Sequence, residues 1–164
     1  MRMREIDSDM LAFWLSRLKS NLRITSNDLD DELLATLVSS IESAEHHIGR
    51  VIPLSTITET LPFSPVVALG RPLVSVDGLK VDDTTVDLGE CEVDVFAGTV
   101  TLPENVEGKA VEVTYKAGRE QLPADIVKAV NLMAGFRFQN PMDSVEMLEK
   151  ASSKMLRPYR NYEL

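Results

Sequence analysis

The hydrophobic pattern changes its period within residues 110–130, which read AVEVTYKAGREQLPADIVKAV. Val111, Val113 and Tyr115 alternate with polar residues, as in a β-strand that buries one of its faces. A few residues later, Leu122-Pro123 opens a helical pattern. Proline is tolerated in the first turn of a helix because no backbone N–H is needed there. This stretch therefore predicts a last strand that is followed directly by a helix.

Helical periodicity holds on both sides of the strand-like region. It predicts two N-terminal helices, at about 8–22 and 28–49, and two C-terminal helices, at about 122–139 and 143–156. Gly49 lies where a C-cap glycine belongs. The apolar stripe of the first helix consists of Leu11, Trp14, Leu15, Leu18 and Leu22.

Between the helix pairs, residues of about 56–116 follow a period of two. The connections are too short for parallel crossovers, so we expect an antiparallel sheet of four to six short strands. Residues 96–99, Phe-Ala-Gly-Thr, predict a hairpin turn, and Asp77-Gly78 and Asp82-Asp83 are turn or bulge signals.

The fold class that follows is α+β: two N-terminal helices, an inserted small antiparallel β-sheet and two C-terminal helices. Because the sheet is inserted between the helix pairs, the helices must bury their stripes on each other while the sheet covers its own apolar face. A length of 164 residues suits one domain, predicted to span residues 1–164, with a tail at 157–164.

Composition restricts the function classes. The formal charge of −9 argues against a protein that grips nucleic acid over its whole surface. Two readings of the acidity stay open: solubility, or a surface that DNA passes without sticking. The single cysteine, Cys91, excludes an intramolecular disulfide. No apolar run is long enough to span a bilayer, so no membrane association is predicted.

Candidate catalytic and metal-binding residues are few. His46 and His47 are adjacent, so on a helix they point about 100° apart and do not readily share a metal ion. Cys91 has no histidine near it in sequence, and is read as a small strand or turn residue. The acidic run around Asp82-Asp83 lacks the ligand spacing of a calcium loop. We therefore predict no enzyme, no metal and no cofactor.

A basic, aromatic C-terminus contrasts with the acidic whole. The tail contains Arg157, Tyr159, Arg160 and Tyr162, and the third helix places Lys128 and Arg137 among apolar residues. Tyrosine and arginine are favoured as interface anchors. Two alternatives stay open: the tail is a docking peptide, or it folds back onto its own core.

The ordered set of motifs resembles the head–tail connector (adaptor) family of tailed bacteriophages and prophages, from about Leu11 to Arg160. The matching stretches are LDDELL (29–34) through AEHHIGR (44–50), RPLVSV (71–76), VEVTYKAG (111–118), LPADIVKAV (122–130) and LRPYR (156–160). Phe13-Trp14 has no secure counterpart in that pattern.

The resemblance implies a non-enzymatic ring, typically of twelve subunits, at the head–tail junction of a virion that is assembled in the bacterial cytoplasm. It implies a portal protein and a tail-completion protein as partners, with DNA passing through the channel without sequence-specific binding. It gives Arg157, Tyr159, Arg160 and Tyr162 a portal-docking role. The alternatives are a small ligand-binding or enzymatic α+β domain, with a site around His46, His47 or Cys91, and another phage tail-completion protein.

Overall fold

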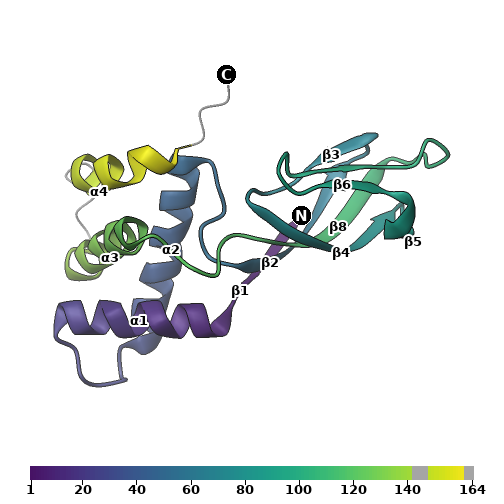
Figure 1. Ribbon diagram of the computed structural model, residues 1–164. Coiled ribbons are helices and arrows are strands. Elements are labelled where there is room, and N and C mark those ends of the chain that lie inside the picture. The colour runs from purple at the N-terminus through teal and green to yellow at the C-terminus, as the bar shows by residue number, and fades with distance from the viewer. Residues whose placement is uncertain (142–147, 161–164) are drawn as a thin grey trace. The chain divides into compact units, whose positions relative to one another are not determined.

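The computed structural model describes residues 1–141 and 148–160, and the chain falls into two compact units (Figure 1). The sheet unit comprises Met1–Asp7 and Pro53–Glu120, and the helical unit comprises Ser8–Ile52 and Gln121–Leu164. Helices and antiparallel strands make up these units, which confirms the α+β class. The assignment of residues 1–164 to a single domain stays a prediction.

The helices lie close to their predicted bounds. They are α1 (Ser8–Leu22), α2 (Asp30–Ile48), α3 (Ala124–Gln139) and α4 (Leu148–Leu156), followed by one 3-10 turn, η2 (Arg157–Tyr159). The predicted start of the fourth helix, at 143, lies outside the described residues. The first helix has the predicted bounds, because its apolar stripe begins and ends within it.

Helix α3 is central to the helical unit, where it packs against α1, α2 and α4 (Figure 1). Of the predicted stripe of α1, Trp14 and Leu18 are fully buried. The rest of this core comes from all four helices: Leu33, Leu37, Ile41, Ala44 and Ile48 of α2, Ile126, Ala129, Val130 and Ala134 of α3, and Leu156 of α4. The helices thus bury their stripes on one another, as expected of helix pairs that flank an inserted sheet.

The predicted helix boundaries have identifiable physical causes. Gly49 ends α2 in the left-handed conformation, with φ of 69°, and its N–H donates to the carbonyl of Glu45 at 2.8 Å. Pro123 is the N-cap of α3 rather than its first helical residue, so the prediction was off by one position. Its carbonyl accepts from the N–H of Ile126 at 3.0 Å.

The sheet unit contains eight strands and one 3-10 turn within the described residues. They are β1 (Arg2–Ile6), β2 (Ser55–Pro62), β3 (Val66–Ala68), β4 (Leu73–Val81), β5 (Thr84–Thr85), η1 (Leu88–Glu90), β6 (Glu92–Asp94), β7 (Thr99–Thr101) and β8 (Ala110–Ala117). They form two antiparallel sheets, of order β1-β2-β8-β4-β5 and β3-β7-β6. The inserted β region is therefore antiparallel, as predicted, and its strands belong to two small sheets, the larger of which also includes β1.

Strand β8 lies in the middle of the larger sheet, between β2 and β4. Val111, Val113, Tyr115 and Ala117 are fully buried, and the intervening residues are not. This alternation confirms the period of two that was predicted for Val111, Val113 and Tyr115. Strand β1 was not predicted. It pairs with β2 along the edge of the sheet, and its charged sequence RMREI carries no clear alternation.

The predicted turns are present in the sheet unit. Asp82 and Asp83 form the β4–β5 turn with φ of 45° and 67°, the left-handed geometry that aspartate tolerates better than most residues. Asp77 lies at a shift in register between β4 and β8, which marks a bulge. β6 and β7 form the hairpin that was predicted around residues 96–99.

Candidate assembly surfaces

The C-terminal segment is anchored just before the residues that we predicted to dock. Leu156 is 1% exposed, and the Ser152 hydroxyl lies 3.5 Å from the carbonyl oxygen of Ala129 in α3. These contacts fix the last turn of α4 on the core of the helical unit. The segment beyond it therefore begins from a defined point.

Three of the four predicted docking residues lie within the described chain. Arg157 and Arg160 are exposed and Tyr159 is half-buried, while Tyr162 lies outside the described residues. The α-helix ends at Leu156, as expected before Pro158, and one 3-10 turn follows it. This places two cations and an aromatic ring at the surface of the helical unit. The docking role itself stays a prediction.

Arg137, which we predicted to lie with these cations, has an internal role. Its guanidinium donates to the hydroxyls of Ser39 at 3.1 Å and Ser43 at 2.9 Å, and lies 3.4 Å from that of Ser40. These hydrogen bonds join α3 to one face of α2. Lys128, by contrast, is exposed.

The two candidate histidines lie next to each other on one helix, α2. His46 is exposed and His47 half-buried on α2. In the part of the chain that the structure describes, His, Cys, Asp and Glu side chains nowhere gather in a group of three or more that could hold a metal ion.

Cys91 lies half-buried beside η1, with its Sγ 3.6 Å from the carbonyl oxygen of Asp87. Burial, and then the nearby carboxylates of Asp87 and Glu90, raise the pKa of its thiol. A raised pKa lowers the fraction of thiolate at neutral pH, and the thiolate is the reactive form. This environment disfavours a nucleophilic role.

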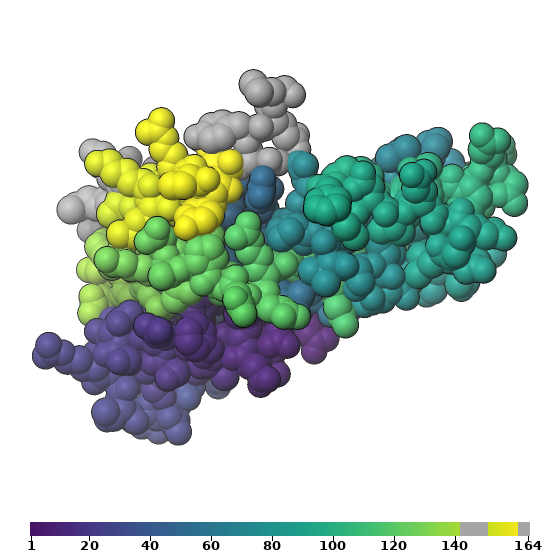
Figure 2. Space-filling model, viewed as in Figure 1, coloured from purple at the N-terminus to yellow at the C-terminus, as the bar shows by residue number. Residues whose placement is uncertain are grey.

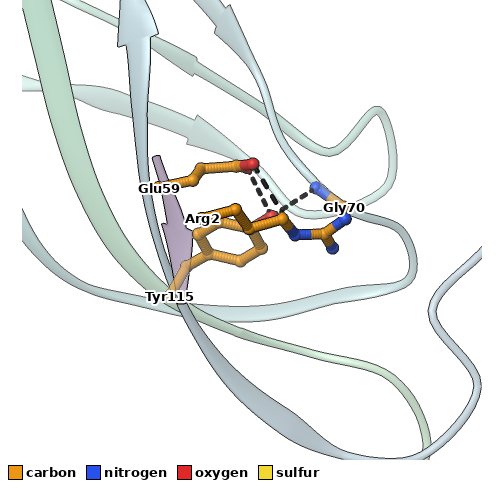
Figure 3. A network of polar contacts seen from close by, with 4 residues as sticks. All are labelled: Arg2, Glu59, Gly70 and Tyr115. Atoms are coloured by element: carbon orange, nitrogen blue, oxygen red, sulfur yellow. Dashed lines mark hydrogen bonds and ion pairs between the residues drawn. The ribbon is translucent and has the colours of Figure 1, made fainter. Parts of the chain in front are cut away.

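A partly buried polar network joins β1, β2 and β8 of the large sheet to Gly70, in the loop before β4 (Figure 3). The Tyr115 hydroxyl donates to Oε1 of Glu59 at 2.6 Å and accepts from the N–H of Gly70 at 3.1 Å. Nε of Arg2 lies 3.9 Å from the other carboxylate oxygen of Glu59. Burial and the hydrogen bond to Glu59 raise the pKa of Tyr115 to about 12. The hydroxyl, which is protonated at neutral pH as in any tyrosine, links β8 to β2 and to Gly70.

The negative charge is concentrated in one segment of the sheet unit. Residues 81–108 contain eight Asp and Glu and no Lys or Arg. All eight are exposed: Asp82, Asp83, Asp87, Glu90, Glu92, Asp94, Glu104 and Glu107. The segment includes β5, η1, β6 and β7. We call it the acidic segment below.

Within residues 1–141 and 148–160, none of the helices combines the length and the hydropathy that a bilayer span requires.

No protein-family model matches this sequence, and no curated protein matches it. Solved structures do. A chain in the neck of an empty GTA particle, computed with C6 symmetry, has a TM-score of 0.75 at 18% identity, and the match covers 100% of this chain and 97% of that chain. A chain in the neck of a native GTA particle, computed with C12 symmetry, gives the same values. A chain in the virion of a native gene transfer agent (GTA) particle has a TM-score of 0.74 at 19% identity, with the same coverage. At these identities the likeness shows a shared fold over the whole chain.

Proposed function

We propose that this protein is a structural subunit of the neck of a tailed phage or phage-like particle, in a ring that joins the portal to the tail. The observation that carries the proposal is the fold match along the full length of a neck chain, at a TM-score of 0.75.

Within this proposal the chain acts as a head–tail connector (adaptor). The motifs that carry this resemblance include residues with structural roles inside the sheet unit. Tyr115 holds the polar network, and Gly118 has φ of +107° with the carbonyl oxygen of Pro53 so close that a Cβ would lie 2.1 Å from it. These motifs therefore support the fold, and the neck role rests on the fold match and the motif order together.

The ring is the assembly that a repeated side-to-side contact produces when its rotation closes. A neck computed with C12 symmetry is among the matched structures, which supports the predicted twelve subunits. Packaged DNA would pass through the ring. The formal charge of −9 supports passage without adhesion, because carboxylates repel phosphates. A ring whose lumen proved to be lined with Lys and Arg would contradict that last point.

The portal is proposed to bind the C-terminal segment through Arg157, Tyr159, Arg160 and Tyr162. Support comes from the two exposed guanidiniums, which follow immediately after the anchored Leu156. Arginine and tyrosine at a surface next to a rigid anchor are typical of interface hot spots.

The proposal is tested by mixing the protein with its cognate portal and imaging the complex by electron microscopy. We expect a closed ring of this chain stacked on the portal. Deletion of residues 157–164 leaves the buried core in place, so circular dichroism should be unchanged while portal binding is lost. Lys154→Ala, an exposed cation one turn earlier, is the matched control and should bind normally. A full-length protein that does not associate with its portal would refute the neck role. Unchanged binding after the deletion would refute only the docking role.

A further inference from the structure

The β6–β7 hairpin presents an unusually exposed aromatic ring. Phe96 is 93% exposed at the tip of the hairpin, and Val95 beside it is 40% exposed. Val93 on β6 is 38% exposed. These three exposed apolar side chains lie within four successive residues of the hairpin, and we call them the hairpin patch. Contiguous exposed apolar surface with polar surroundings is characteristic of interaction sites.

The hairpin patch is held in a defined conformation. Oδ1 of Asp94 accepts from the N–H groups of Phe96 and Ala97, both at 2.9 Å. The N–H of Gly98 donates to the carbonyl of Asp94 at 2.8 Å, and the Gly98 carbonyl accepts from Leu69 at 2.8 Å. Because these hydrogen bonds hold the turn in one conformation, its backbone loses little conformational entropy when the Phe96 ring docks on a partner. This favours binding.

The charge around the hairpin patch selects its partner. The patch lies within the acidic segment, where Glu90, Glu92 and Asp94 are exposed, and these carboxylates outnumber the one cation, Arg71, whose side chain lies beside Gly98 of the turn. Like charges disfavour association with nucleic acid or another acidic surface, and opposite charges favour a basic one. The partner surface should therefore combine an exposed apolar ring with a cation.

Such a surface occurs on α1 of the same chain. Phe13 is 46% exposed, and the guanidinium carbon of Arg17 lies 5.4 Å from the centroid of its ring. The adjacent Trp14 is fully buried, because it lies on the apolar stripe and Phe13 lies off it. α1 forms part of the visible surface of the helical unit (purple in Figure 2). We call Phe13 and Arg17 the α1 patch.

We propose that the hairpin patch of one copy docks on the α1 patch of the next copy in the ring, with Phe96 against Phe13 and the acidic strand β6 facing Arg17. The inference rests on the proposed function. A ring needs heterologous contacts, in which two different patches of each subunit are complementary, and these two patches differ in charge and share exposed aromatic rings. Neither patch belongs to the hydrophobic core of its own unit.

Cross-linking between copies tests the contact. Two variants are made in a Cys91→Ser background, one with Phe96→Cys and one with Phe13→Cys, and are mixed with a short bismaleimide. We expect mixed dimers of the two variants to exceed the dimers that each forms alone. Val66→Cys is the matched control for Phe96→Cys, because Val66 is 50% exposed on the other edge strand of the same small sheet. If the Val66 variant cross-links to the Phe13 variant as well as the Phe96 variant does, the contact is wrong.

Charge reversal provides a second readout. Glu92 and Arg17 are both exposed, so Glu92→Lys and Arg17→Glu should fold normally. Each alone should weaken self-association in sedimentation experiments, and the double variant should restore it. Phe96→Ala should weaken it about 30-fold, as loss of an interface aromatic commonly does.

Lack of rescue by the double variant would overturn the pairing. Rings seen on the portal without the preferred cross-link would refute this contact alone. Failure to bind the portal would count against the proposed function instead.

Discussion

Replacing Tyr115 with phenylalanine should destabilise the sheet unit, because the ring stays while the hydroxyl is lost. That hydroxyl makes a 2.6 Å hydrogen bond to the Glu59 carboxylate and accepts from Gly70 at 3.1 Å. A hydrogen bond to a charged group contributes about 1.5–3 kcal/mol. The Glu59 side chain is 15% exposed, so water replaces the lost donor only in part. We expect Tyr115→Phe to lower the free energy of unfolding by about 2 kcal/mol at pH 8.

The pH dependence of this difference is more diagnostic than its size. The pKa of Tyr115 is raised to about 12 in the folded protein, against 10.0 for an ordinary tyrosine. The tyrosine contributes its full stability below pH 10 and loses it as the pH rises towards 12, because the unfolded chain ionises first. The loss is about 3 kcal/mol, at about 1.36 kcal/mol for each pH unit. The variant has no such group. Because the full loss is reached only above pH 12, the stability gap between the two proteins should shrink steadily between pH 10 and 12.

Urea unfolding followed by far-UV circular dichroism measures this gap at pH 8 and at pH 11.5. Trp14, the single tryptophan, lies in the core of the helical unit, so its fluorescence follows that unit separately. Tyr159→Phe, at a half-buried tyrosine of the helical unit, controls for a general effect of losing a hydroxyl. A gap below about 0.5 kcal/mol at pH 8, within the range of ordinary surface substitutions, would refute the reasoning. So would a gap that is the same at both pH values.

Three further outcomes are expected. Gly118→Ala should cost about 3 kcal/mol or prevent folding, since its positive φ and the nearby backbone leave no room for a Cβ, whereas Gly78→Ala, with nothing within 4 Å, should change the urea midpoint little. Arg137→Ala should cost about 1–2 kcal/mol through the lost hydrogen bonds between α3 and α2, while Lys128→Ala should be nearly neutral; equal effects on thermal unfolding would contradict the internal role of Arg137. Cys91 should react with iodoacetamide with a pH midpoint above that of an unstructured cysteine peptide, because its thiol pKa is raised; a lower midpoint would show an activated thiol.

The helices could be predicted from the sequence because their signals are local. A stripe with a period of 3.6 over fifteen or more residues, ended by Gly49 or preceded by Pro123, fixes both the type of element and its bounds. The β8 alternation is equally local. The α+β class could be predicted as well, because the chain shows helical periodicity, then a strand-like period of two, and then helical periodicity again.

The sheet arrangement depended on pairing between distant segments, which the periodicity does not record. Strand β1 is a strand because it lies against β2, whose sequence position is more than fifty residues later. The short strands β3, β6 and β7 form their own sheet because of how they pair, while their individual patterns resemble those of the larger sheet. Edge strands with charged residues are the least recognisable kind.

The side chains at the candidate surfaces also divide into those with a local sequence signal and those whose position depends on distant segments. Arg137 was grouped with the surface cations because nothing near it in sequence reveals the serines of α2, nearly a hundred residues earlier. The exposure of Phe13 had a local signal, since it lies off the stripe that contains Trp14 and Leu18. The exposure of Phe96 had one as well, because it is the apolar residue of a predicted hairpin turn.

Residues that stabilise the fold can be distinguished from residues that would mediate assembly. Tyr115 and Gly118 belong to a motif of the resemblance, and both have structural roles inside the sheet unit. Selection for the fold alone would keep them, whatever the protein assembles with. Phe96 and Phe13 are different, because neither contributes to the core and each exposes apolar surface to water. An exposed aromatic ring contributes little packing energy to a monomer. Substitutions at the hairpin and α1 patches, which leave stability unchanged, therefore test assembly in a way that core substitutions do not.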